Sequence, residues 1–345
     1  MKKYAIVLCL FIGMMVGMAG CQSSAGTPEK LVIRVGYFPN ITHSQALIGM
    51  ARGDFQTALG NSVEIQATQF NAGPSAIEAI FAGQIDLTYI GPNPAINGFI
   101  KSEGKALRIV CGATSGGAAF IVRPAANIRT AADLAGKKIA SPQLGNTQDV
   151  ALRRYILDNG LKTLEQGGTV EVVPTDNPQI LDLFRLGEID GAWVPEPWAS
   201  RLVVEGGGEL FLDERELWTE TNGEFVTAHI IVSSEFLAEH PDLVKAWIRA
   251  HIEVTQWELD HPAEAQALLN TEIEKLTGKK LAAEVLSMAW GRMTVTWDPI
   301  SASLFTSAQS AYEAGFLKEP PVLDGIYDLS LLNSVLKEKS LTPVE

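Results

Sequence analysis

Apolar and polar positions follow two periods along the middle of the chain. Apolar residues alternate with polar ones in SVEIQATQF at 62–70, a period that predicts a β-strand. In NAGPSAIEAIFAG at 71–83 they recur at intervals of three and four, which predicts a helix that starts near Pro74 and stops at Gly83. Strands that alternate with helices of about ten residues build parallel sheets covered on both faces. We therefore predict an α/β fold.

One unit of this pattern occurs twice. The segment GQIDLTYIGPNP at 83–94 aligns with GEIDGAWVPEPW at 187–198. In each, a glycine ends a helix, an Ile-Asp pair starts a strand and prolines stiffen the following turn. Asp86 and Asp190 stand near the strand starts, so we predict structural roles for both. The repeat predicts two lobes of similar build.

After these two series the pattern becomes mostly helical, from about Glu235 to Gly315. Before that, FVTAHIIVSS at 225–234 predicts a strand that rejoins the first lobe. Two crossings rich in small and polar residues would form a hinge. The predicted division is a signal peptide at 1–20, a tether at 21–30, lobe 1 at 31–115 and 225–320, lobe 2 at 116–224, and a C-terminal segment at 321–345.

The N-terminus has the pattern of an export signal. MKK is basic, residues 4–18 are apolar, and Met18-Ala19-Gly20 precede Cys21. A cysteine directly after small residues is typical of bacterial lipoproteins, so we expect Cys21 to carry the lipid that anchors the chain to the outer face of the cell membrane. Acyl chains contribute about 0.8 kcal/mol per buried methylene, which suffices to hold a soluble domain there.

The composition excludes several classes of function. The formal net charge is −13, and nucleic acid is not an expected partner because phosphates are neutralised by clustered Lys and Arg. Once the signal is removed, Cys111 is the remaining cysteine besides Cys21, and we expect it to be a small buried apolar residue. The five histidines lack ligand-like spacing, so no metal site is predicted. We find no hydrolase or nucleotide-binding motif and expect neither an enzyme nor a cofactor.

Loops after the predicted strands are the candidate site, since open α/β sheets bind ligands beyond the carboxyl ends of their strands. Three of these loops lead into helices, at Gly73–Ser75, around Asn93 and at Gly145–Gln148. Helix N-termini offer free N–H groups and partial positive charge, which suits an oxyanion, although each such residue alone is an ordinary helix cap. Aromatic side chains in the same loops would line an apolar part of the ligand: Tyr37, Phe38, Tyr89, Trp193 and Trp198.

Several longer motifs occur in the order of a known family. They include VGYFP, FNAGPSAIEAIFAGQIDLTYIGPNPAI, DLAGKKIASPQLGNTQDVALRRYILDNGL and LFRLGEIDGAWVPEPWASRL, after the lipoprotein-type signal. With them the chain resembles the substrate-binding proteins of ABC importers, and within these the aliphatic sulfonate, taurine and nitrate binding family. The resemblance implies a two-lobe, type II periplasmic-binding fold that closes on a small ligand. It also implies a monomer that delivers this ligand to a membrane permease driven by a separate ATPase.

The resemblance and the loops together give a set of candidate ligand-binding residues. They are Tyr37, Phe38, Asn40, His43, Gln45, Asn71, Gly73, Ser75, Gly91, Asn93, Asn146, Thr147, Gln148, Trp193 and Glu196. Trp290 and Trp297 lie near a later helix end and could also border the site.

The ligand class is the open question. Sulfonates suit helix N-termini beside aromatic side chains, whereas a lone nitrate would not need so many aromatics. Glu196 disfavours a plain anion unless the ligand also carries an amine, as taurine does, or unless Glu196 binds a neighbouring donor. The alternatives are a heterocycle such as a thiamine-precursor pyrimidine or a flavin precursor, a surface hydrolase or transferase, and a ligand sensor that docks on a membrane receptor.

Overall fold

The computed structural model describes residues 30–345. The predicted signal peptide, the lipidation site at Cys21 and all but the last residue of the tether lie outside this part of the chain. Between residues 30 and 345, none of the helices is both long and apolar enough to cross a bilayer.

The first sheet has six strands in the order β11-β4-β10-β3-β1-β2. β1 pairs in parallel with β2 and β3, whereas β10 lies antiparallel between β3 and β4. The strands are β1 Leu31–Tyr37, β2 Val63–Gln69, β3 Leu87–Ile90, β4 Leu107–Gly116, β10 Val226–Ser233 and β11 Met293–Val295. The structure thus confirms that the strand predicted at 225–234 returns to the first sheet.

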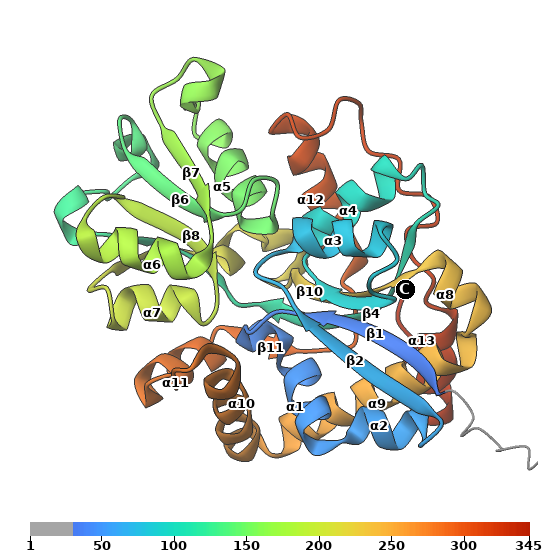
Figure 1. Cartoon of the computed structure of the whole chain (residues 1–345). Helices are drawn as coiled ribbons and strands as arrows, with labels where there is room; N and C mark the ends of the chain where they lie inside the picture. Colours follow the sequence, from blue (N-terminus) through green and yellow to red (C-terminus); the bar gives the residue numbers. More distant parts are fainter. Residues whose placement is uncertain (1–29) are drawn as a thin grey trace, which may run out of the picture. The chain divides into compact units, whose positions relative to one another are not determined.

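The second sheet has five strands in the order β7-β6-β8-β5-β9. β6 pairs in parallel with β7 and β8, and β5 is antiparallel to β8 and β9. The strands are β5 Ala118–Val122, β6 Lys138–Pro142, β7 Glu171–Thr175, β8 Gly191–Pro195 and β9 Glu209–Asp213. The chain therefore enters this sheet after β4 and leaves it before β10 (Figure 1).

The sequence repeat has the same structural role in both sheets. Asp86, just before β3, accepts a hydrogen bond from the backbone N–H of Arg34 in β1 at 2.7 Å. Asp190, just before β8, accepts one from the backbone N–H of Lys138 in β6 at 2.9 Å. Each aspartate thus fixes the start of its own strand against the parallel neighbour, which confirms the predicted structural roles.

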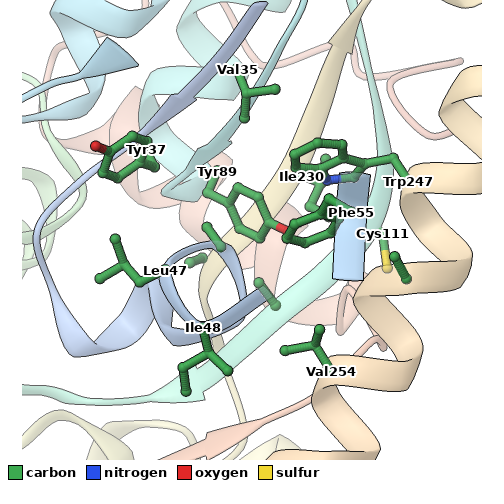
Figure 2. Packing of buried hydrophobic residues seen from close by; sticks show 14 of the residues in the cluster. Val35, Tyr37, Leu47, Ile48, Phe55, Tyr89, Cys111, Ile230, Trp247 and Val254 are labelled. Atoms are coloured by element: carbon green, nitrogen blue, oxygen red, sulfur yellow. The ribbon is translucent and has the colours of Figure 1, made fainter. Parts of the chain in front are cut away.

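Helices cover both faces of the first sheet (Figure 1). One face packs against α1 Ser44–Arg52, α2 Asp54–Leu59, α8 Ser234–Glu239, α9 Pro241–Asp260, α10 Pro262–Thr277, α11 Ala283–Trp290 and α13 Ser330–Glu338. The other face packs against α3 Gly73–Phe81, α4 Pro92–Lys101 and α12 Ser301–Glu313. Figure 2 shows the first of these cores, where the Phe55 ring stacks on Trp247 with 3.9 Å between centroids. Cys111 is buried in the same cluster, as predicted.

The second sheet is covered in the same way. α5 Thr147–Asp158 packs on one face through Leu152 and Ile156. α6 Asn177–Leu186 and α7 Trp198–Val204 pack on the other. The two sheets with helices on both faces confirm the predicted α/β class.

Three local details complete the fold. The helical pattern ALIGMARGDF at 46–55 is interrupted at Gly53, whose φ of 77° is left-handed, so α1 and α2 are separate. The segment TAADLAG at 130–136 forms a short 3-10 turn, Ala131–Leu134. The C-terminal segment contains α13, whose Leu332, Val335 and Leu336 belong to the core of the first sheet.

Candidate functional site

A small cavity lies where loops from the two sheets face each other. The first sheet and its loops contribute Phe38, Asn40, Thr42, His43, Asn71, Ala72, Gly91 and Thr227. The second contributes Asn146, Thr147, Gln148, Asn177 and Pro195. Most of these residues follow the carboxyl ends of the parallel strands, where open α/β sheets bind ligands. The volume of this cavity is about 20 Å³, which leaves room for little more than a water-sized group.

The cavity lining is polar but uncharged. Of the described residues that form it, none is Asp, Glu, Lys or Arg. α5 and α6 begin at Thr147 and Asn177, so two helix N-termini border the cavity. The free N–H groups and partial positive charge at these N-termini favour an anion. An anion can therefore bind here although no Lys or Arg side chain lines the cavity among the described residues.

Two buried polar atoms at these N-termini lack a partner among the described residues. They are Oγ1 of Thr147 and Oδ1 of Asn177. Buried polar atoms are normally hydrogen-bonded to protein or to ordered water, so this pair offers hydrogen-bonding positions to a molecule that enters the cavity. The hydroxyl can donate, and either end of the Asn177 amide can be turned into the cavity.

His43 adds a directed donor from the first sheet. The η1 turn, Ile41–His43, carries it, and its ring stacks on Phe38 with 4.5 Å between centroids. Its Nδ1 accepts the backbone N–H of Phe38 at 3.2 Å, which leaves the proton of the neutral ring on Nε2. Burial, together with nearby His229, lowers the pKa of His43 to about 3, so the ring is neutral near pH 7.

Gly91 and Thr147 bring the two sides of the cavity very close together. A Cβ at Gly91 would lie 2.3 Å from Oγ1 of Thr147. Such a distance is far below van der Waals contact, so a larger residue at position 91 would force the Thr147 side chain or the loops to shift. The φ of Gly91 is −75°, which any residue adopts, so glycine is favoured here for steric rather than conformational reasons.

Asp149 holds the loop before α5 in place. Its carboxylate accepts hydrogen bonds from the Gly145 N–H at 2.9 Å and from Oγ of Ser141 at 2.7 Å. Nε of Arg153, one turn along α5, also donates to it at 3.2 Å. Burial raises the pKa of Asp149 against these partners. The position of Asn146 and Thr147 therefore depends on this buried carboxylate.

Eight of the candidate residues from the sequence meet at the cavity. They are Phe38, Asn40, His43, Asn71, Gly91, Asn146, Thr147 and Gln148. Whether they contact a ligand stays a prediction.

Four other candidates shape the surrounding loops instead of lining the cavity. Gln45 donates from Nε2 to Ala113 O at 2.6 Å, and Ser75 donates from Oγ to Ala72 O at 2.9 Å. Asn93 donates from Nδ2 to Ser307 O at 3.1 Å. Gly73 allows the close approach of Pro94, which a Cβ would meet at 2.2 Å.

The aromatic candidates Tyr37 and Trp193 lie in the hydrophobic cores. Tyr37 belongs to the core of the first sheet, and Trp193 is fully buried beside Phe120 in the second. Tyr89 is also core, and its hydroxyl is 3.0 Å from Nδ1 of His251. Among the described residues that line the small cavity, Phe38 is therefore the one Phe, Tyr or Trp, and its ring stacks on that of His43.

Glu196 points away from the cavity. Its carboxylate accepts hydrogen bonds from Ser200 N at 3.0 Å and from Arg292 Nη1 at 2.8 Å. The side chain is fully buried, and burial raises its pKa while Ser200 and Arg292 oppose the rise. This geometry favours the neighbouring-donor alternative over a ligand amine. It also joins the second sheet to Arg292, which stands one residue before β11 in the first.

Two residues that line the cavity, Asn177 and Thr227, lie outside the loops that the resemblance implies for the site. Thr42, Ala72 and Pro195 lie inside those loops, which run from Tyr37 to Gln45, from Asn71 to Ser75 and from Trp193 to Glu196. Asn177 follows β7 and begins α6, so the rule on strand ends could have found it, although Asn before Pro at a helix start is also an ordinary capping pattern. Thr227 lies inside β10 rather than after a strand, and no local pattern singles it out.

Comparisons with known proteins place these observations in a family context. The family model described as NMT1-like matches residues 26–271. A putative aliphatic sulfonates-binding protein of Bacillus subtilis is 24% identical over 344 residues, which cover 99% of this chain and 98% of that protein.

Two solved structures are similar in fold. The alkanesulfonate-binding protein SsuA of Xanthomonas axonopodis, bound to MOPS, has a TM-score of 0.72 at 21% identity and covers 88% of this chain and 99% of its own. The periplasmic nitrate-binding protein NrtA of Synechocystis has a TM-score of 0.75 at 13% identity and covers 90% and 89%. The predicted type II periplasmic-binding fold is thereby confirmed.

Proposed function

The chain belongs to the NMT1-like family, and from this premise we propose that it is an extracytoplasmic solute-binding protein of an ABC importer. Its ligand is a small sulfonate-like organic anion, held between the two sheets at this cavity, which has to widen beyond its 20 Å³ as the lobes separate to admit the anion. The observation that carries this proposal is the uncharged cavity at two helix N-termini, in which Thr147 Oγ1 and Asn177 Oδ1 lack partners among the described residues.

The chemistry of the lining suits an oxyanion. A sulfonate has three equivalent acceptor oxygens, and the cavity offers the Thr147 hydroxyl, Nε2–H of His43 and the free N–H groups of α5 and α6. Hydrogen bonds to a charged group are roughly twice as strong as neutral ones, so such a set can bind an anion without a cation. The sulfonate-binding relatives support this choice.

The remaining parts of the proposal come from the sequence. The lobes are 31–115 with 225–320 and 116–224, and their separation and closure would admit and hold the ligand. Cys21 carries the lipid that anchors the chain to the outer face of the membrane. The partners are a permease and its ATPase, and the chain acts as a monomer without a cofactor and without catalysing a reaction. Relatives that are binding proteins support this assignment.

A thermal-shift experiment on the purified full chain tests the ligand class. Propane-1-sulfonate is expected to raise the melting temperature, because a ligand that binds only the folded state stabilises it by about 2.7 kcal/mol at a hundred times Kd. Nitrate, butyrate as the carboxylate control, and a hydroxymethylpyrimidine are measured beside it. No shift with the sulfonate, or a shift with the pyrimidine alone, would overturn the proposal.

A further inference from the structure

A second, larger cavity adjoins the small one. Its volume is about 520 Å³, within the range of small-molecule sites. Thr147 lines both cavities, so the two share a wall at the N-terminus of α5. α5 and α12 form its sides, together with the segment around Trp218 that follows β9.

Glu214 is an unusual member of this wall. The residue is 3% exposed, and its Oε2 accepts the indole N–H of Trp193 at 2.7 Å. Unlike Glu196, which has Arg292, it has no cationic partner among the residues that the structure describes. A buried carboxylate without a cation is costly, and a cation supplied by a ligand would remove that cost.

The other charged groups at this cavity do not supply the missing cation. Arg154 of α5 already pairs with Asp158 at 2.7 Å and with Glu313 of α12. Carboxylates therefore outnumber guanidinium groups in the lining. Behind the wall, Asp213 pairs with Arg215 at 2.7 Å. The field in the cavity favours a positive group.

The uncharged lining has a polar part, mostly hydroxyl and amide side chains of α5 and α12, and an apolar and aromatic part. Tyr155, Leu217 and Trp218 belong to the apolar and aromatic part, and the Trp218 ring stacks on Phe225 with 5.3 Å between centroids. Aromatic faces attract ammonium groups and also contact alkyl chains. A ligand tail that is apolar along its length and cationic at its end matches this surface.

We propose that the ligand is zwitterionic, with its sulfonate in the small cavity, its carbon chain passing Thr147, and a protonated amine bound to Glu214 in the larger cavity. The inference rests on the proposed function, because it uses the sulfonate site as the anchor of the chain. It moves the amine-binding role that the sequence had suggested for Glu196 to Glu214.

Calorimetric titration of the full chain at pH 8 tests this assignment with matched ligands. Propane-1-sulfonate is compared with 3-aminopropane-1-sulfonate, and hexane-1-sulfonate with 6-aminohexane-1-sulfonate. At one of these lengths or both, the amine is expected to lower Kd at least tenfold. In Glu214→Gln the ratio of the two Kd values should fall to about one, since the amide keeps an acceptor for Trp193 but carries no charge.

Two further variants make the result specific. Glu216→Gln changes an exposed acid on the same short helix, η5 Glu214–Leu217, and should keep the preference for the amine. Loss of the preference in Glu196→Gln but not in Glu214→Gln would overturn the assignment. So would equal affinities of wild type for the two members of both pairs. If the plain sulfonates themselves fail to bind, the proposed function fails instead, so the two failures are distinguishable.

The pH dependence of wild type gives a readout that needs no variant. Burial raises the pKa of Glu214 to about 7, so the carboxylate loses charge as the pH falls below that value. The amine preference should therefore decline from pH 8 to pH 6, while the affinity for propane-1-sulfonate changes much less. A preference that is independent of pH over this interval would contradict Glu214 as the partner.

Discussion

At the scale of single residues, Gly91 sets how closely the two sides of the small cavity approach. A Cβ at this position would lie 2.3 Å from Oγ1 of Thr147, across the cavity. Because this is shorter than van der Waals contact, any residue other than glycine would force Thr147 or the two loops to shift. The small size of the cavity thus depends on the lack of a Cβ at Gly91.

Gly91→Ala is expected to weaken sulfonate binding by tenfold or more. The added Cβ would lie 2.3 Å from Thr147, so the two sheets could not reach the arrangement in which both contact the anion. The melting temperature without ligand should be affected less than sulfonate binding, because Ala accepts the backbone angles of Gly91 and the two sides of the cavity can move apart when no ligand joins them. Isothermal titration with propane-1-sulfonate measures the effect.

Gly291→Ala is the matched control for this substitution. Its φ is −69°, and a Cβ there would meet its nearest atom at an ordinary 3.5 Å. Binding should stay as in wild type. If Gly91→Ala also binds normally, the close approach of the two sides is not needed for the ligand.

The roles of two glutamates show what could not be predicted from the sequence alone. Glu196 and Glu214 are both acids near strand ends of the second sheet, and the sequence favoured Glu196 because it stands between two prolines. Only the three-dimensional neighbours separate them: Arg292 lies 96 positions away from Glu196 and neutralises it. Side-chain direction and long-range partners decide such roles, and neither is a property of a local pattern.

At the scale of elements, α5 shows how one buried acid differs from an exposed one. The helix carries two Asp–Arg pairs at spacing i,i+4, Asp149 with Arg153 and Arg154 with Asp158. Asp149 is fully buried and also holds the loop before the helix, whereas the Asp158 side chain is 49% exposed. We therefore expect the buried Asp–Arg pair to contribute more to the free energy of unfolding than the partly exposed pair in the same helix.

Asp149→Ala is expected to lower the free energy of unfolding by about 3–5 kcal/mol, since it leaves Arg153 and the Gly145 N–H without their buried partner. Asp158→Ala, the exposed counterpart, should cost about 1 kcal/mol or less. Urea denaturation of both variants measures the difference. Similar losses in the two would mean that the carboxylate of Asp149 is not important for the loop.

Most elements could be predicted from the apolar pattern and from the Gly, Pro or Asn residues that bound them. Many helices are amphipathic, whereas strands such as β3, β5 and β8 are buried along their whole length and read as nearly continuous apolar runs. The break at Gly53 could not be predicted, since a glycine in a helical pattern predicts either a tolerated residue or a stop. The loops of the site followed from the rule on strand ends. That rule places loops correctly but does not say which side chain of a loop, such as Asn93 or Gln148, enters the cavity.

At the scale of the whole molecule, buried ionisable groups set the dependence of stability on pH. Burial raises the pKa of Glu258 to about 8, and its Oε2 accepts a hydrogen bond from Ser44 at 2.6 Å. Burial also lowers the pKa of His43 and His229 to about 3 and of His251 to about 4. These groups all favour their neutral forms in the folded state.

The two kinds of group act in different intervals. A glutamate with a raised pKa stabilises the fold below its usual pKa near 4.5, and this contribution is lost as the pH rises toward 8. The histidines contribute stability that is complete above about 6.5 and lost as the pH falls toward 3. Of the buried groups named here, Glu258 is the one whose protonation still changes above pH 6.5. The free energy of unfolding should therefore fall from pH 6.5 to 8.5.

Glu258→Gln should flatten that decline. The amide keeps an acceptor for Ser44 and cannot ionise, so the melting temperature at pH 8.5 should exceed that of wild type by several degrees. At pH 4.5 the two proteins should melt at similar temperatures. Thermal denaturation at these pH values provides the measurement, and a wild-type decline that persists unchanged in the variant would assign it to other groups.

The position of β10 has a consequence for the order in which the molecule can be completed during its synthesis. β10 bonds to β3 on one side and β4 on the other, yet it lies at 226–233, after every strand of the second sheet. On the ribosome, the second sheet can therefore be finished while the first still lacks its middle strand. Until then β3 and β4 have unpaired inner edges, the kind of surface that recruits strands from other chains. The part of the protein that is begun first is the last to close.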